Sequence, residues 1–321
     1  MKKLMKKRYL LLLLVILSIA SLFIGVSSLS IKDVLAFNEE KINLLMISRV
    51  PRLMSILVAG VGLSVSGLIM QQISRNKFVS PTTAATADFA KLGVLFTMMY
   101  GGRMSQMAQM TTAFVFAMAG TLLFMSIMKH IKIKNIIFVP LVGLMLGKVV
   151  GSITSYFAYK YDLVQNLTSW MEGNLSVIMA GNYEMLYLSI PVVVIGFLYA
   201  NQLTIAGMGE DFAKNLGLNY QVIVNLGLGI VSLITAVTLV TVGNIPFLGL
   251  IIPNIVSLYA GDNLRHSLYH TALIGPIFLL ICDILGRIVI YPFEVSIGMM
   301  VGVIGGAIFL TMLVRRANTY A

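Results

Sequence analysis

Apolar residues run along this chain in long blocks that short polar stretches separate. A helix that crosses the hydrocarbon core of a membrane needs about 20 mostly apolar residues, and most of the blocks approach that length. They predict about ten transmembrane helices, at residues 9–30, 50–72, 83–100, 110–128, 136–158, 186–200, 221–242, 246–260, 269–290 and 294–314. The sixth block contains Pro191 and the eighth begins at Pro246; both are short, so we expect a break or a tilt in each.

The composition agrees with this pattern. Hydrophobic residues make up 58% of the 321 residues and charged residues 11%, far from the averages of soluble domains. The predicted fold class is therefore all-α, a polytopic membrane protein. The longest external polar stretches, 31–48 and 159–185, are too short to fold separately, so residues 1–321 are expected to form one membrane domain. The basic start MKKLMKKR resembles that of a signal peptide, but the first block is too long for one, which favours a retained helix.

The formal net charge of +11 comes from lysines and arginines placed singly or in short runs at the ends of apolar blocks. Because they do not line one face, they give no indication of a nucleic-acid partner. If the N-terminus is cytoplasmic, 14 of these residues lie inside and 7 outside. Cytoplasmic loops carry the excess of positive charge, so both termini are expected in the cytoplasm.

With this orientation, residues 201–220 form a cytoplasmic loop between the sixth and seventh helices. Within it, Gly209 and Gly217 suit the start and the end of a short helix. Glu210 and Asp211 then lie at the positive end of the helix dipole, where carboxylates are stabilising. The loop thus predicts a short acidic helix exposed to the cytoplasm.

The same short helix would carry an apolar face. Met208, Phe212 and Leu216 recur at every fourth position, and Lys214 lies four residues after the first acid. One interpretation is that the helix lies on the lipid surface. Helices of that kind are usually rich in lysine and arginine, whereas this one has two acids and one lysine, which favours docking of a soluble partner.

Several motifs follow one another along the chain, among them RVPRL (49–53), GEDFAKNLGL (209–218) and GNIPFLGLIIPNIV (243–256). Together they resemble ordered motifs of the FecCD/BtuC family, the permease subunits of type II ABC importers for iron-siderophores, haem and cobalamin. GEDFAKNLGL is similar to the coupling loop of that family. RVPRL (49–53) and SGLIMQQISRNKFVSP (66–81) resemble its second-helix motifs. GNIPFLGLIIPNIV (243–256) and PFEVSIGMMVGVIGGAIFLTML (292–313) resemble its later ones, so the resemblance covers nearly the whole chain.

The resemblance implies a BtuC-like permease that opens alternately to each side of a bacterial cell membrane. It implies two cytoplasmic ATPase subunits, which bind ATP and Mg²⁺, and a second permease, either another copy or a homologue. It implies an extracytoplasmic siderophore-binding protein that docks over Arg49, Arg52 and Arg287. The ATPase-coupling residues it implies are Gly209, Glu210, Asp211, Phe212, Ala213, Lys214, Leu216 and Gly217.

Some positions depart from the family pattern. Lys77 replaces a common proline, Asn254 a common histidine, and Ser257 a common arginine. NKFVSPTTAATADFAKLG (76–93) also differs from the usual leucine- and glycine-rich version and is similar to the branch that handles catecholate siderophores such as petrobactin or enterobactin. These departures bear more on which cargo the protein would carry than on how it would carry it.

Other roles remain open for the charged residues near the helices. Terminal arginines also anchor helices at the membrane interface, and Arg287 can pair with Asp283 four residues before it. Lys148, deep in a predicted helix, either faces the translocation path or is paired within the bundle. Asp88 and Lys91 are expected to pair at the cytoplasmic end of the third helix.

The remaining candidates for the translocation path, Gln71 and Asn254, belong to the motifs that carry the family resemblance.

A rival interpretation is an ion-coupled carrier that acts alone. Such carriers place carboxylates in the middle of the membrane, but Asp88, Asp283 and Glu294 all lie near predicted helix ends. GLMLGKVV (143–150) is not a phosphate-binding loop, so energy from ATP would need a partner chain. Cys282 and three scattered histidines predict no metal site, and no catalytic constellation is evident; we expect neither an enzyme nor a bound cofactor.

Overall fold

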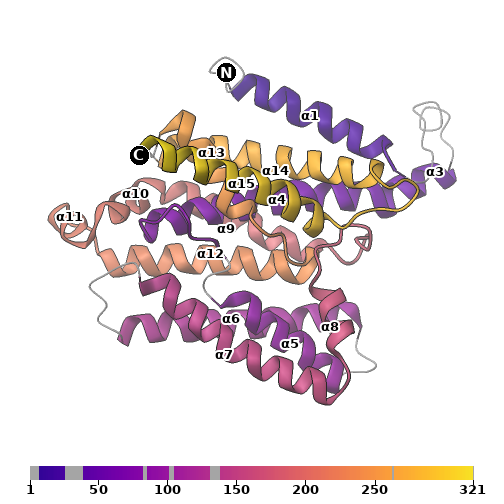
Figure 1. Ribbon diagram of the computed structural model, residues 1–321, viewed down its shortest axis with the longest axis horizontal. Helices are drawn as coiled ribbons and strands as arrows, with labels where there is room; N and C mark the ends of the chain where they lie inside the picture. The colour runs from indigo at the N-terminus through magenta and orange to yellow at the C-terminus, as the bar shows by residue number, and fades with distance from the viewer. Residues whose placement is uncertain are drawn as a thin grey trace.

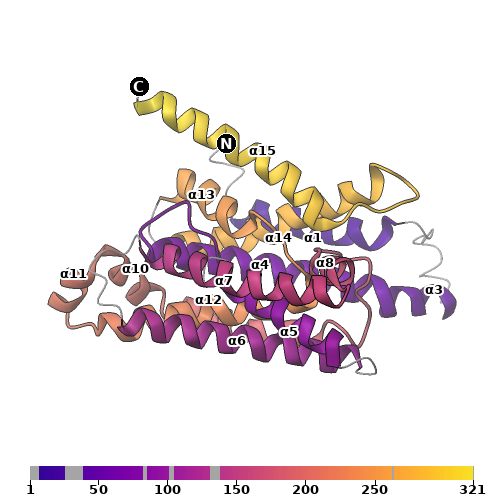
Figure 2. The ribbon, with the colours of Figure 1, turned by 60° about the horizontal axis from the view of Figure 1, so that its bottom comes forward.

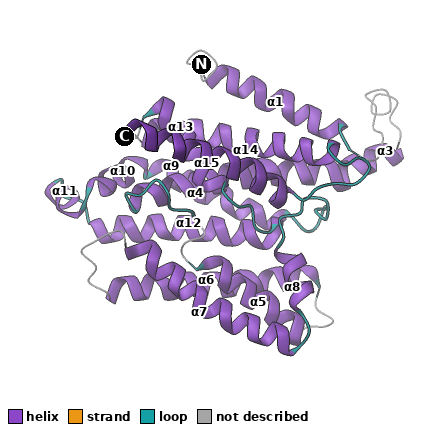
Figure 3. Cartoon of the chain, in the orientation of Figure 1, coloured by secondary structure: helices purple, strands orange, loops and turns teal. Residues whose placement is uncertain are grey.

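The computed structural model describes residues 7–25, 39–81, 85–100, 105–130, 138–261 and 264–320. Over these ranges the chain folds into helices joined by loops, and no strand is present (Figure 3). A single isolated bridge pairs Glu172 with Asn244 between two of the loops. The predicted all-α fold class is confirmed.

Each predicted block coincides with a helix. The helices are α1 (Lys7–Phe23), α3 (Glu39–Leu44), α4 (Val50–Ile73), α5 (Thr86–Tyr100), α6 (Gln106–His130), α7 (Phe138–Lys160), α8 (Val164–Met171), α9 (Ser189–Leu198), α10 (Ala200–Met208), α11 (Glu210–Asn215), α12 (Tyr220–Val242), α13 (Leu248–Ala260), α14 (Leu264–Ile288) and α15 (Ile297–Tyr320). By length and hydropathy, five helical segments among the described residues can each cross a membrane, or six if a bent pair counts as one span. Two shorter apolar helical stretches, Leu248–Tyr259 and Ile297–Met312, coincide with two more of the ten predicted crossings.

The long helices run side by side, with α11 at one end of the bundle and α3 at the other (Figure 1). We call these the α11 end and the α3 end. The central helix, α4, packs against α12, α13 and α14, while α5, α6 and α7 pack on one another as a second group. Figure 2 shows α15 leaving the bundle at an angle.

Two segments expected to be loops are helical. Glu39–Ile73 is one continuous helical stretch in which a π-helical turn, Leu45–Arg49, precedes Pro51. That local widening accommodates a proline that lacks a backbone N–H, and Pro51 lies inside the continuous helical stretch. Ala200–Met208, predicted as part of the 201–220 loop, forms α10. This helix is bent by 61° from the preceding helical segment, Glu184–Leu198, and buries Leu203.

The broken sixth segment confirms the expected break, although its position differs. The interruption lies at Tyr199, between α9 and α10, rather than at Pro191. Pro191 is instead accommodated in the first turn of α9, where its missing N–H costs little.

Helix α5 begins halfway along its neighbours α6 and α7. The hydroxyl of Thr86 lies 3.3 Å from that of Thr121, in the middle of α6. The carboxylate of Asp88 lies against Gly147 and Gly151, in the middle of α7. Asp88 and Lys91 lie in the first two turns of α5, the end of the third helix at which the sequence places them, and this end lies beside the middle of α6 and α7.

Small residues let the central helices approach closely. A Cβ atom on Gly60 would lie 2.6 Å from the Cα of Pro276 in α14. A Cβ atom on Gly67 would overlap the backbone carbonyl of Gly249 in α13. In lipid, where no hydrophobic force drives helices together, such close packing supplies much of the attraction between them.

We expect Gly67→Ala to destabilise the fold by roughly 1–3 kcal/mol, because the methyl group forces α4 and α13 apart. Gly229→Ala is the matched control, since a Cβ atom at this helical position meets nothing within 4 Å. Thermal unfolding of the purified permease in detergent measures both. Equal midpoints for the two variants would show that the contact between α4 and α13 contributes no stability.

Candidate functional sites

The short helix α11 closes one end of the bundle. Gly209, with φ of 127°, separates it from α10, and Gly217, with φ of 78°, follows its last turn. The N–H of Gly217 donates to the carbonyl of Lys214 at 2.9 Å, and the N–H of Leu218 to that of Ala213 at 3.0 Å. These bonds satisfy carbonyls at the helix end, so the glycines bound a helix as the sequence predicts.

The side chains of α11 are presented outward. Phe212 is 48% exposed and Leu216 56%. Glu210 and Lys214 form an exposed ion pair at 2.7 Å, and the hydrogen bond with Glu210 raises the pKa of Lys214. Only Ala213 is buried. An exposed aromatic ring beside a charged pair is the composition of a protein contact rather than of a folded interior.

Two further observations refine the predicted apolar face. Met208 is exposed but ends α10, since the backbone turns at Gly209, so it does not share a helix with Phe212. A shallow hollow of about 560 Å³ lies beside α11 and is lined by Glu210, Lys214 and residues 217–221. The guanidinium group of Arg75, just beyond the end of α4, lies against Gly209 and so connects α11 to the central helix.

At the α3 end, four charged side chains form a network. Arg52 in α4 donates from Nε and Nη2 to Oδ1 of Asp283 at 3.1 and 2.8 Å, and from Nη1 to Oε2 of Glu294 at 2.6 Å. Arg287 pairs with the other oxygen of Asp283, one turn away on α14. The pair of Asp283 with Arg287, one of the alternatives that the sequence allows, is present. Asp283 also pairs with Arg52, which belongs to another helix.

The same arginines attach α1 to the bundle. Arg287 donates from Nη1 to the carbonyls of Ser21 and Ile24 at 2.8 and 2.6 Å. Arg49 also donates to the carbonyl of Ile24. Carbonyls at the last turn of a helix have no intrahelical partner, so these bonds satisfy the end of α1.

The network is closed to solvent on most sides. Arg49, Arg52 and Arg287, the three residues predicted to receive a binding protein, are 6%, 9% and 3% exposed. The side chain of Glu294 is 19% exposed and that of Asp283 only 1%. Burial alone would raise the pKa of Glu294, but hydrogen bonds from Ser176 and Arg52 hold that pKa below its usual value. Glu294 is thus the most accessible carboxylate of the network.

Three separate segments meet between the two ends of the bundle. The N–H of Asn244 donates to the carbonyl of Met171 at 2.9 Å, and the N–H of Asn174 to that of Val242 at 3.1 Å. The N–H of Gly298, at the start of α15, donates to the carbonyl of Gly173 at 3.0 Å. We call this meeting point, made of residues 171–174, 242–244 and Gly298, the three-segment crossing.

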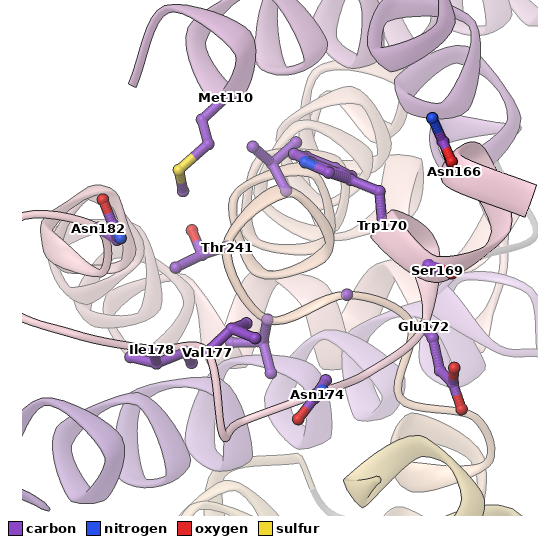
Figure 4. A pocket seen from close by; sticks show the side chains of 13 residues that line it. Met110, Asn166, Ser169, Trp170, Glu172, Asn174, Val177, Ile178, Asn182 and Thr241 are labelled. Carbon is purple, nitrogen blue, oxygen red and sulfur yellow. The ribbon is translucent and has the colours of Figure 1, made fainter. Parts of the chain in front are cut away.

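A cavity borders the crossing on each of two sides. The first, of about 350 Å³, is lined by Trp170, Thr241 and the amides of Asn166, Asn174 and Asn182 (Figure 4). The second, of about 580 Å³, is lined by residues from the starts of α5 and α15 and from both loop segments of the bridge: Ala87, Asp88, Lys91, Thr168, Met171, Glu172, Gly173, Leu239, Asn244, Pro246, Gly298 and Met299. We call the second the central cavity, and Glu172 borders both.

Gln71 and Asn254, predicted to line the translocation path, are used within the fold. Gln71 is 8% exposed and donates to the carbonyl of Leu250 at 3.1 Å. Asn254 is 7% exposed and donates to the carbonyls of Lys77 and Leu250, both at 2.7 Å. Both amides therefore fix α13 against α4 and the chain that follows it.

Lys148 lies on the exposed side of α7, next to Gly147. The carboxylate of Asp88 interacts electrostatically with Lys148 more strongly than with Lys91. The predicted pair of Asp88 with Lys91 therefore leaves out a second lysine, from α7. The sequence could not show this arrangement, because it depends on the depth at which α5 begins.

Comparison with known proteins shows which family this chain matches. The model of the FecCD transport family matches residues 12–315. The petrobactin import system permease protein YclN of Bacillus subtilis is 58% identical over 312 residues, covering 97% of this chain and 99% of that protein. The ferric-anguibactin transport system permease protein FatD of Vibrio anguillarum is 38% identical, covering 93% and 95%.

A solved structure of a metal-chelate type ABC transporter in an inward-facing conformation has the same fold. Its TM-score against this chain is 0.85, with 96% of this chain and 98% of the other covered, at 23% sequence identity. The half-length helices and the bent sixth segment therefore belong to an architecture that has been observed in another protein.

Replacing Asp283 by asparagine should destabilise the permease by about 3–5 kcal/mol, because Arg52 and Arg287 remain buried without their shared counter-charge. The thermal unfolding midpoint in detergent measures the loss. Asp211→Asn on the exposed surface of α11 is the control and should unfold as wild type does. Wild-type stability of the Asp283 variant would contradict the structural role of the network.

Proposed function

This chain belongs to the FecCD transport family, and from that premise we propose that it is the membrane permease of an ATP-driven importer for a ferric siderophore. The proposed cargo is a catecholate siderophore, supported by the likeness to the petrobactin permease. The chain works in a bacterial cell membrane with both termini in the cytoplasm. Under this proposal it moves its cargo without chemical change and leaves ATP hydrolysis to a partner.

The observation that carries the proposal is the exposure of α11 at one end of the bundle. Two ATPase subunits, each with bound ATP and Mg²⁺, dock on α11 of two permeases, with Phe212 as the apolar anchor and Glu210 to Lys214 as the charged rim. Closure of the ATPase pair on ATP moves α11. The contact of Arg75 with Gly209 passes that movement to α4 and hence to the core of the bundle.

A second permease, identical or homologous, completes the path. Helix α7 exposes Leu144, Met145, Val149 and Tyr156, with Lys148 among them. A lysine that faced lipid at the middle of a helix would cost at least about 2.5 kcal/mol. We therefore place this face of α7 against the partner permease and the path between the two, where Lys148 meets water or cargo.

We propose that the binding protein docks on the α3 end, over Arg49, Arg52 and Arg287. Since Asp283 and Glu294 already occupy the guanidinium groups of Arg52 and Arg287, an acidic residue of the binding protein would have to exchange with one of the two carboxylates. Glu294, the more exposed of them, is the one that leaves. Exchange of a carboxylate at the rim of the interface affects the orientation of the binding protein and its rate of association more than its affinity for the permease.

Transport is tested by reconstituting the permease in liposomes with its ATPase and binding protein. The proposal expects ATP-dependent uptake of ferric catecholate, measured with radiolabelled iron. Uptake by the permease alone, driven by an ion gradient without the ATPase, would instead establish the carrier interpretation.

Phe212→Ala should weaken association with the ATPase by at least about tenfold, because truncating an aromatic anchor in an interface costs more than about 1–2 kcal/mol. Co-purification and titration of the ATPase against the permease in nanodiscs measure the change. Phe293→Ala is the matched control, since Phe293 is 74% exposed at the opposite end of the bundle. If the two variants bind the ATPase equally well, α11 is not its docking site.

A further inference from the structure

The smaller of the two cavities at the three-segment crossing, which we call the amide cavity, combines an aromatic wall with three side-chain amides. Asn166 and Trp170 come from α8, Asn174 from the crossing, and Asn182 from the segment between the crossing and α9 (Figure 4). The volume of about 350 Å³ lies at the low end of the range of roughly 300–1,000 Å³ that is typical of small-molecule sites. The amide cavity therefore has room for a single ring and its substituents.

Much of the hydrogen-bonding capacity of this wall is unused within the fold. No described residue forms a hydrogen bond with the side-chain amides of Asn166 and Asn182 or with the indole N–H of Trp170. Asn174 uses only its carbonyl oxygen, which accepts from the N–H of Ser176 at 2.9 Å. An amide carries N–H donors and a carbonyl acceptor side by side, so this wall suits a ligand whose groups both donate and accept.

The rest of the wall is apolar. Trp170 packs against the hydrophobic cluster that residues of α5, α6 and α12 form, and Met110, Val177 and Ile178 add to the lining. Water would pair with the amides but would gain nothing from these apolar groups. A ring with an apolar face and hydroxyl groups at its edge can use both kinds of wall.

The charge on the wall selects among such ligands. Glu172 is the only charged residue among the described residues that line the amide cavity. Its carboxylate points away from Trp170 and accepts a hydrogen bond from Ser296 at 2.9 Å (Figure 4). A negative charge at the edge, without a cation among the described lining residues, repels anions such as the metal-bound oxygens of a catecholate. The amide cavity thus favours a neutral ring.

The placement of the amides distinguishes two kinds of neutral ring. Asn166 and Asn182 lie on opposite sides of Trp170, and Asn174 lies on a third side (Figure 4). A free catechol carries hydroxyl groups on adjacent carbons only, whereas a pyranose carries them around its whole edge. The arrangement of the amides matches the pyranose.

We propose that the amide cavity is a binding site for a neutral pyranose ring, with Trp170 against the face of the ring and the amides of Asn166, Asn174 and Asn182 bonded to its hydroxyl groups. The site goes beyond the transport of the chelate and does not depend on the identity of the cargo. With both termini in the cytoplasm, α8 follows the outer end of α7. There the pyranose comes either from a free sugar or from the glycosyl headgroup of a lipid.

Trp170 is the single tryptophan of the chain, so its fluorescence reports on the amide cavity alone. The purified permease is kept in a detergent without a sugar headgroup and titrated with methyl glucopyranoside and methyl galactopyranoside. We expect a saturable shift of the emission to shorter wavelength, because the ring displaces water from the indole. Saturation-transfer NMR, which detects weak ligands, compares both glycosides with catechol, and catechol should bind more weakly than at least one of them.

Asn166→Ala and Asn182→Ala should each weaken binding of the glycoside by roughly three- to tenfold, the loss of one neutral hydrogen bond. Their unfolding midpoints should match that of wild type, since neither amide is bonded to a described residue. Asn201→Ala, exposed on α10, is the matched control and should bind the glycoside as wild type does.

A lipid with a glucosyl headgroup, added to the micelles, distinguishes the two sources. An emission shift at a lower concentration of this lipid than of methyl glucopyranoside would identify a headgroup site. A shift with the methyl glycoside alone would identify a site for soluble sugar. Both results support the pyranose class.

Three results would overturn the inference: no saturable shift with either glycoside, wild-type binding by both asparagine variants, or stronger binding of catechol than of both glycosides. None of them affects the proposed function, which ATP-dependent uptake tests separately. Failure of that uptake would in turn leave the pyranose site standing.

Discussion

The fold depends on hydrogen bonds to the N–H and C=O groups of the non-helical backbone that lies inside the bundle. After α4 the chain turns back to start α5 at the middle of α6 and α7, and α13 begins beside Gly67 of α4. Irregular backbone at that depth is tolerated only where protein groups or water satisfy it. Asn254 does so by donating to the carbonyl of Lys77, and the three-segment crossing does so by pairing loop with loop. The central cavity exists because these helices begin there.

Helix α4 joins the two ends of the molecule. At one end Arg52 belongs to the charged network that holds α1 and α14, and just past the other end Arg75 lies against Gly209 beside α11. Between them, Gly60 and Gly67 pack directly on backbone of α14 and α13. Close-packed interiors deform little, so a displacement of α11 is carried along α4 as a movement of a stiff element rather than absorbed by side chains.

Much of this could be predicted from sequence, because apolar blocks and glycine positions are local signals. All ten blocks became helices, and Gly209 and Gly217 bound α11 as expected. The features that the sequence did not predict share one physical cause. The depth of Asp88, the second partner of Arg52 and the helical state of α10 all depend on contacts between residues far apart in the chain. Glu294 lies 242 residues from Arg52, and no local pattern connects them.

The dependence of the fold on close packing and buried hydrogen bonds explains why the architecture can be recognised without identifying the cargo. The solved transporter with the same fold shares 23% of its residues with this chain, so the backbone arrangement persists when most side chains differ. The glycine contacts and buried amides that hold the bundle together do not depend on which molecule passes through it. Discrimination between cargoes must then come from side chains that do not hold the fold together. Among these side chains, charged groups act over the longest distance. Because an ionised group inside a membrane is energetically unfavourable, a charged side chain at that depth points to a functional role.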